Sequence, residues 1–240
     1  MNFRDAKVRE RVIKDRDRGY AFVPAGSIDL DQRIASRLAA IQASMNQAPL
    51  DPYEPNGNRS RYHNQLILDP ATRSLHVRAG VGYWRASHLG YEYSGEERKF
   101  DPIPDAILDA SFFRDWIWFW FDLLPASLFP PISPVLVEVH LMRTRPGPVI
   151  VNQFHKDGEP FFVLSLLGRR NINDATTQIA HDPQGREVVD RFVLAEPLDS
   201  LLVDDRTVYH NVTPFRALDE SQPAFRDIIN VGFIPLVRNG

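Results

Sequence analysis

The chain contains no cysteine among its 240 residues. This absence excludes disulfide scaffolds, iron–sulfur clusters, thiolate zinc sites and cysteine nucleophiles. Any metal ion must therefore be bound by histidine, aspartate or glutamate. Lysine is also scarce, since the 28 basic residues include only four lysines and the remainder are arginines. We interpret this bias mainly as genome composition, although arginine also suits bidentate recognition of carboxylates.

The sequence also lacks a basic face and a long apolar run. The net charge is −3 with the two signs interspersed, which argues against a nucleic-acid or membrane-surface partner. The run Phe112–Leu124 contains Arg114, Asp115 and Asp122 and is shorter than the roughly 20 apolar residues of a membrane span. We interpret it as a buried, aromatic-rich helix. The charged segment Met1–Arg18 has no apolar leader region, so we expect a cytoplasmic protein.

A hydrophobic content of 43% with 25% charged residues predicts one globular domain spanning residues 1–240. Residues 1–130 form a part that we expect to be mostly helical, and residues 131–240 form a β-rich part. Apolar periodicity predicts helices at Arg4–Arg18 and Asp29–Asn46. Strands are expected in this first part at Tyr20–Val23, Arg61–Leu68 and Leu75–Val77.

The second part is a succession of short apolar or β-branched runs separated by turn residues. Such spacing without intervening helices predicts an antiparallel sandwich or jelly roll, and the fold class is therefore α+β. The runs are Val135–Met142, Val149–Phe154, Phe161–Leu167, Arg191–Leu194, Ser200–Val203, Thr207–Val212 and Ile228–Leu236.

Three residues of the β-rich part form a metal-ligand pattern: His155 and Asp157 in FHKDG, and His210 in VYHNV. On an extended segment, His155 and Asp157 point to the same face. Two imidazoles and one carboxylate are the ligand set of non-haem Fe(II) oxygenases, which leaves positions open on the metal. A His-x-Asp triplet alone is expected by chance. Arg226, however, follows on a further strand, and its guanidinium can bind a carboxylate through two hydrogen bonds. The alternative is structural: a satisfied histidine, a turn-capping aspartate and a surface arginine.

The segments FHKDGEPFFVLSLLGRRN, EPLDSLLVDDRTVYHNVTPF and AFRDIINVGF resemble the bacterial isoleucine dioxygenase family, whose members are 2-oxoglutarate- and Fe(II)-dependent dioxygenases that hydroxylate free amino acids. The resemblance implies a double-stranded β-helix (jelly roll, cupin-like) core with N-terminal and flanking helices. It also implies Fe(II), 2-oxoglutarate and O2, with succinate and CO2 released. His155, Asp157 and His210 would bind the iron, while Arg226 and Thr213 would contact 2-oxoglutarate.

Residues 1–130 would then shape the substrate site. An amino-acid zwitterion needs a cation for its carboxylate and an anion for its amine. The substrate candidates are Arg61, Tyr62, Arg143 and Glu159. Exposed ion pairs explain each of them equally well.

Other polar residues are given structural interpretations. If HLMRTR is a strand, His140 and Arg143 point to opposite faces, so at most one faces the barrel interior. Asp204 and Asp205 are adjacent, so we expect a turn rather than a shared metal. Four histidines are expected at the surface or in loops: His63, His76, His88 and His181.

Two other functions remain open from the sequence. A jelly-roll oxygenase can act on a nucleobase or a protein side chain, and a jelly-roll module can bind metal without catalysis. If the protein is an amino acid dioxygenase, its reaction can be hydroxylation, desaturation or cyclisation, because all three begin with oxidation of a C–H bond. An oligomer is compatible with the sequence, which carries no signal for its size.

Overall fold

A seven-stranded antiparallel sheet forms the centre of the molecule. The structure is a computed structural model that describes residues 1–30, 32–78, 80, 82–84, 96–108, 111–147 and 153–236. In spatial order the strands are β2 (Tyr20–Val23), β12 (Ser200–Asp204), β9 (Phe161–Arg170), β14 (Phe225–Pro235), β8 (Val135–Thr144), β4 (Arg59–Asp69) and β5 (Ser74–Arg78). Strands from both parts of the chain therefore share one sheet.

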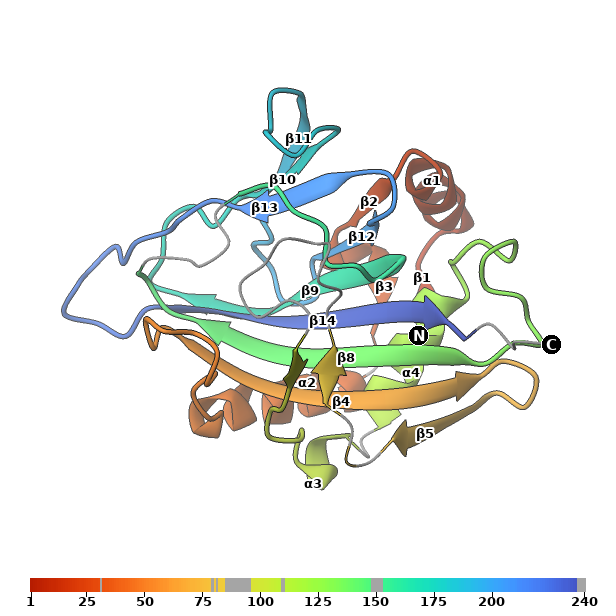
Figure 1. Cartoon of the computed structure of the whole chain (residues 1–240), viewed down its shortest axis with the longest axis horizontal. Coiled ribbons are helices and arrows are strands. Elements are labelled where there is room, and N and C mark those ends of the chain that lie inside the picture. The colour runs from red at the N-terminus through yellow and green to blue at the C-terminus, as the bar shows by residue number, and fades with distance from the viewer. Residues whose placement is uncertain are drawn as a thin grey trace.

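A smaller antiparallel sheet lies above the long strands in Figure 1. It contains, in spatial order, β11 (Val188–Phe192), β10 (Thr177–Ala180) and β13 (Tyr209–Val212). Two short pairs complete the β-structure, and they join β1 (Asn2–Phe3) to β3 (Ile28–Asp29) and β6 (Tyr83–Trp84) to β7 (Glu97–Arg98). The two facing antiparallel sheets form the jelly-roll-like core.

The helices gather on the other face of the large sheet. They are α1 (Ala6–Arg16), α2 (Gln32–Ser44), α3 (Asp105–Leu108) and α4 (Ser111–Phe121), with short 3-10 turns at Ala25–Ser27 and Met45–Gln47. Asp5 caps α1 by accepting a hydrogen bond from the Lys7 N–H at 2.9 Å. In α4, stacked aromatic rings such as Phe112 and Trp116 are buried, as the sequence predicted. Within the described part of the chain, no helix has the length and apolarity needed to cross a membrane.

Strand alternation gives the large sheet two different faces. On β8, Val137, Val139 and Leu141 belong to the core beneath the helices. The residues between them point the other way, toward the smaller sheet. On that side Phe162 of β9 packs with Ile179 of β10 in a second apolar core. We call this second side the inner face, and it is the side that carries the candidate site.

The predicted fold class is confirmed, with local differences. β10 was not predicted, because a four-residue strand in a polar stretch has too short an apolar pattern to recognise. β11 begins at Val188, ahead of the predicted run at Arg191–Leu194. The predicted strand Val149–Phe154 lies mostly outside the described residues, since residues 148–152 are not described.

Candidate metal centre

The three predicted metal ligands come together at the edge of the smaller sheet. His155 and His210 lie opposite each other in an antiparallel bridge, and each backbone N–H donates to the other's carbonyl, at 2.9 and 3.0 Å. Asp157 follows two residues after His155. Its Oδ1 lies 3.7 Å from His155 Nε2, and its Oδ2 lies 3.5 Å from His210 Nε2. These separations fit three ligands around one ion at metal–ligand distances near 2.1 Å.

The electrostatics of this cluster favour a bound cation. His210 is buried, and its ring packs on Phe162 with centroids 4.8 Å apart. Burial by itself would lower the pKa of His210, but hydrogen bonding and charge from Asp157 and Asp205 raise it to about 9. The raised pKa shows that the two carboxylates favour a positive charge at His210, and a bound metal ion can supply that charge in place of the proton. Two imidazoles and one carboxylate with further positions open are the donor set that non-haem Fe(II) uses.

Asp205 orients His210 from behind, which the sequence did not reveal. Its Oδ1 lies 3.6 Å from His210 Nδ1, and its Oδ2 accepts a hydrogen bond from the Gly158 N–H at 2.7 Å. Asp204 turns away and pairs with Arg206 at 2.7 Å, as expected for adjacent residues. The adjacent pair Asp204 and Asp205 was the only indication in the sequence of a carboxylate near His210. Only the fold shows that Asp205 is the one that approaches the histidine.

Replacing Asp205 with asparagine should weaken metal binding by about 10–100-fold, the usual effect of removing a carboxylate behind a ligating histidine. The affinity can be measured by titrating the metal-free protein with Co(II), which is stable in air. Asp122→Asn, which alters an exposed carboxylate at the end of α4, is the control. An unchanged affinity in Asp205→Asn would show that Asp205 does not act on the metal.

Arg226 lies on the inner face of β14 as a buried cation. Its side chain is on the same face as Ile228, which belongs to the inner core. Within the described residues, Arg226 Nε and Nη2 have no hydrogen-bond partner. Burial, with a contribution from Arg169, lowers the pKa of Arg226 to about 10, so the guanidinium remains charged at neutral pH. The buried Nε and Nη2 donors of a charged Arg226 fit a carboxylate ligand, such as a carboxylate of 2-oxoglutarate.

Thr213 and Glu159 are placed by different contacts. The Thr213 hydroxyl accepts a hydrogen bond from the Thr176 N–H at 3.0 Å, so part of its bonding capacity holds the neighbouring loop. Glu159 is buried, and its carboxylate lies directly over Gly232, where a Cβ atom would collide with it. Gly232 is the cross-strand neighbour of Phe162. Glu159 is thus held on the inner face, beside the ring that supports His210.

The other three substrate candidates divide between the two faces of the sheet. Arg61 points to the inner face, where its guanidinium lies over the Phe100 ring and its Nε is 3.2 Å from Asp51 Oδ2. Tyr62 packs in the core beneath the helices. Arg143 lies directly opposite Asp227 and donates to both of its carboxylate oxygens at 2.7 Å. The structure therefore brings Arg61 to the inner face and leaves Tyr62 and Arg143 on the other side.

Arg143→Met should lower the free energy of unfolding by about 3–5 kcal/mol, because it leaves the Asp227 carboxylate buried without its partner. Denaturant unfolding measures this cost. The double variant Arg143→Met/Asp227→Leu removes both charges and should recover much of the stability. A rise in the KM of an identified substrate without loss of stability would instead indicate that Arg143 binds substrate.

One histidine expectation was wrong. His63 lies within β4 and is only 5% exposed, because β4 is flanked on both sides and its inner face is covered. His76 and His181 are exposed as expected, and His88 lies outside the described residues. As expected for a strand, His140 and Arg143 point to opposite faces, but both are buried.

A jelly-roll core that brings two histidines and an aspartate to metal spacing defines the class of non-haem iron oxygenases. The family model described as 2OG-Fe dioxygenase matches residues 42–232. The chain belongs to this family, and it is a 2-oxoglutarate-dependent dioxygenase that uses Fe(II), 2-oxoglutarate and O2.

Similar proteins cover nearly the whole chain. The 3(1)-hydroxy-L-isoleucine 4-dioxygenase of Pantoea ananatis is 26% identical over 90% of this chain and 91% of its own length. The crystal structure of IDO from Bacillus thuringiensis superposes with a TM-score of 0.81, at 20% identity and 99% coverage of both chains. A bsmA homologue from Methylobium petroleophilum gives a TM-score of 0.80 at 22% identity, covering 94% of this chain and 92% of its own. These two structures establish the fold.

Proposed function

We propose that this dioxygenase oxidises a C–H bond of a free L-amino acid or a close derivative, most simply by hydroxylation. The observation that carries the proposal is the pair of opposite charges buried on the inner face, Arg61 and Glu159. They are 7% and 2% exposed, and Arg61 also pairs with Asp51 at 3.2 Å. An amino-acid zwitterion carries one group complementary to each, because its carboxylate can pair with the arginine and its ammonium with the glutamate.

In this proposal His155, Asp157 and His210 bind the iron, which supplies oxidising power when O2 and 2-oxoglutarate are bound. Arg226 holds the distal carboxylate of 2-oxoglutarate through donors that no described residue uses. Thr213 adds a hydroxyl contact at the same end. The charged residues orient the substrate so that one C–H bond faces the metal, and the surrounding apolar side chains exclude water.

We also propose that residues 1–240 form a single domain whose first 130 residues shape the substrate side. Arg61 on β4 belongs to this first part and reaches the same inner face as Arg226. The Pantoea ananatis relative, named for its action on a hydroxylated isoleucine, supports an amino acid as the class of substrate.

The test is a reaction of the purified protein with Fe(II), ascorbate, 2-oxoglutarate and a mixture of amino acids, followed by mass spectrometry. We expect succinate formation coupled to a gain of one oxygen by one amino acid. A loss of two hydrogens would indicate desaturation or cyclisation of the same substrate. Parallel reactions contain single-stranded DNA, RNA or peptides instead. Turnover stimulated by one of these polymers and by no amino acid would overturn the proposal.

A further inference from the structure

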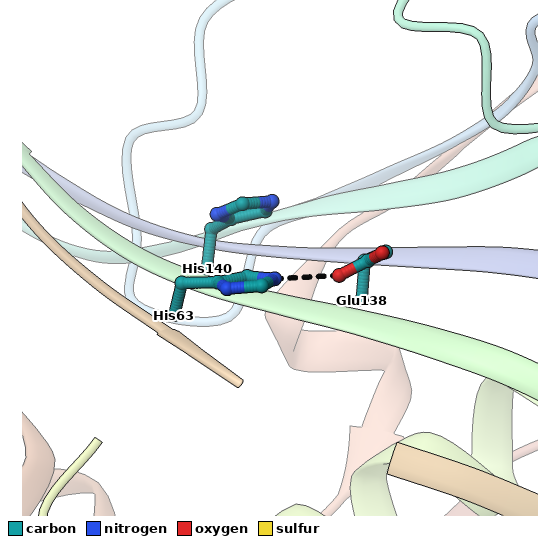
Figure 2. Close-up of side chains that lie close together, drawn as sticks. All are labelled: His63, Glu138 and His140. Carbon is teal, nitrogen blue, oxygen red and sulfur yellow. Dashed lines mark hydrogen bonds and ion pairs between the residues drawn. The ribbon is translucent and has the colours of Figure 1, made fainter. Parts of the chain in front are cut away.

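A second cluster of metal-ligating side chains lies on the inner face, separate from the iron ligands. It contains His63 of β4 with Glu138 and His140 of β8, and all three are buried. One ligand atom from each lies within 4.8 Å of the others. Figure 2 shows the two imidazoles stacked one above the other, with their ends directed toward the carboxylate. We call these three residues the β4–β8 cluster.

The β4–β8 cluster repeats the local topology of the iron ligands. His63 lies directly opposite His140 across an antiparallel pair, as His155 lies opposite His210. In each cluster the carboxylate is two residues along the chain from one of the histidines, and Glu138 and His140 both lie on β8. Glu138 therefore points to the same face as His140. Ligands at such positions converge without any distortion of the backbone.

The contacts within the cluster provide a carboxylate that is already oriented. Glu138 Oε1 accepts a hydrogen bond from Gln65 Nε2 at 2.8 Å, while Oε2 faces His63 Nε2 at 2.5 Å. The two imidazole rings lie 4.5 Å apart, at 26° to each other. The hydrogen bond from Gln65 leaves the other carboxylate oxygen directed at the histidines. Residues behind a metal ligand commonly orient that ligand in this way.

The surroundings of the cluster are apolar on one side and negative on the other. Tyr83 packs edge-on against both His63 and His140, with ring centroids 5.6 and 4.8 Å away. On the other side, Glu138 is the cross-strand neighbour of Gly232, over which the Glu159 carboxylate lies. A divalent cation here is shielded from bulk water and has a second carboxylate one strand away.

We propose that His63, Glu138 and His140 bind a second divalent metal ion of the zinc class. Two imidazoles and one carboxylate, with water in the fourth position, are ligands that zinc accepts. The ion takes the place of the direct contact between His63 Nε2 and Glu138 Oε2. Zinc–ligand distances of about 2.0–2.1 Å in a tetrahedral site separate the ligand atoms by about 3.3 Å. Binding therefore moves the His63 and Glu138 atoms apart by under an ångström and brings the stacked rings closer at their ends.

The ion would serve a structural role. It links β4 to β8 two residues from Arg61, so it fixes the strand that carries this inner-face cation. Zinc has no redox chemistry of its own, so the site is compatible with an oxidising iron centre nearby. The proposal depends on neither the substrate nor the role given to His155.

The experiment counts zinc ions in a background where the iron ligands are disabled. The full-length His155→Ala protein is stripped with a chelator, dialysed against Zn(II) alone and analysed by mass spectrometry of the metal content. We expect about one zinc per chain, which falls to none in His155→Ala/Glu138→Gln. Zinc should also raise the thermal midpoint of His155→Ala by several degrees and leave that of the double variant unchanged.

Matched controls separate ligand loss from misfolding. His155→Ala/His76→Gln changes an exposed histidine on β5 and should keep its zinc. Circular dichroism verifies that each variant is folded, and His155→Ala/His63→Gln provides a second test if the Glu138 variant does not fold. An absence of zinc in folded His155→Ala would overturn the proposal, leaving His63 and Glu138 a hydrogen-bonded pair. Zinc retained by the folded Glu138 or His63 double variants would place the ion elsewhere and overturn it equally.

Discussion

Replacing His155 with alanine should abolish Fe(II) binding and bring 2-oxoglutarate turnover below detection. The proposed iron site has three protein ligands, and His155 is held in place by two backbone hydrogen bonds with His210. Its removal leaves one imidazole and one carboxylate, which are too few protein ligands to hold Fe(II) tightly. Iron content and succinate release, measured on the purified variant, test this prediction together.

The matched control is His181→Ala, which removes an exposed histidine and should change neither quantity. Because the backbone bridge to His210 does not use the His155 side chain, the variant should stay folded. Full iron occupancy and normal succinate release in His155→Ala would show that the metal is bound elsewhere. The β4–β8 cluster would then become the first alternative to examine.

Replacing Arg226 with methionine should raise the KM for 2-oxoglutarate by about 100-fold or more. Loss of one partner from a buried charge pair costs about 2–5 kcal/mol, and a factor of 100 corresponds to about 2.7 kcal/mol. Methionine keeps the apolar length of the side chain, so the inner core should remain packed. Steady-state kinetics with 2-oxoglutarate as the varied substrate provides the measurement.

Two further variants sharpen this result. Arg226→Lys should fall between the wild type and Arg226→Met, because an ammonium keeps the charge but not the two-pronged geometry. Arg216→Met alters an exposed arginine and should leave the KM unchanged. An Arg226→Met protein with an unchanged KM and a lower kcat would contradict a role in binding 2-oxoglutarate.

Two of the candidate iron ligands, His155 and Asp157, follow a local pattern, whereas His210 joined them through the family resemblance. His155 and Asp157 share a face through the two-residue repeat of extended backbone, and the strands around them carry clear apolar runs. Arg61 and Tyr62 were both named as substrate candidates, but adjacent strand residues point to opposite faces, and only Arg61 lies on the inner one. That distinction needs the helices and the smaller sheet, which cover different faces.

Residues that meet across distant strands were not predictable. His63 and His140 become neighbours only through the β4–β8 register, which sequence alone does not fix. Arg143 was named as a substrate candidate because it offers a cation to a carboxylate, and nothing in the local sequence indicates its partner. Its partner, Asp227, lies 84 residues away. Asp205 was similarly recognisable only once its turn was seen to pass behind His210.

The sequence by itself determined the chemistry available to this protein. The absence of cysteine leaves nitrogen and oxygen ligands for any metal, and the strand pattern with its histidines and aspartate indicates an oxygenase core. The tertiary structure alone decided which charged residues share the inner face and which are paired beneath the helices. The physical reason is that side-chain alternation is a property of a few consecutive residues, whereas register and burial depend on contacts between strands far apart in the chain.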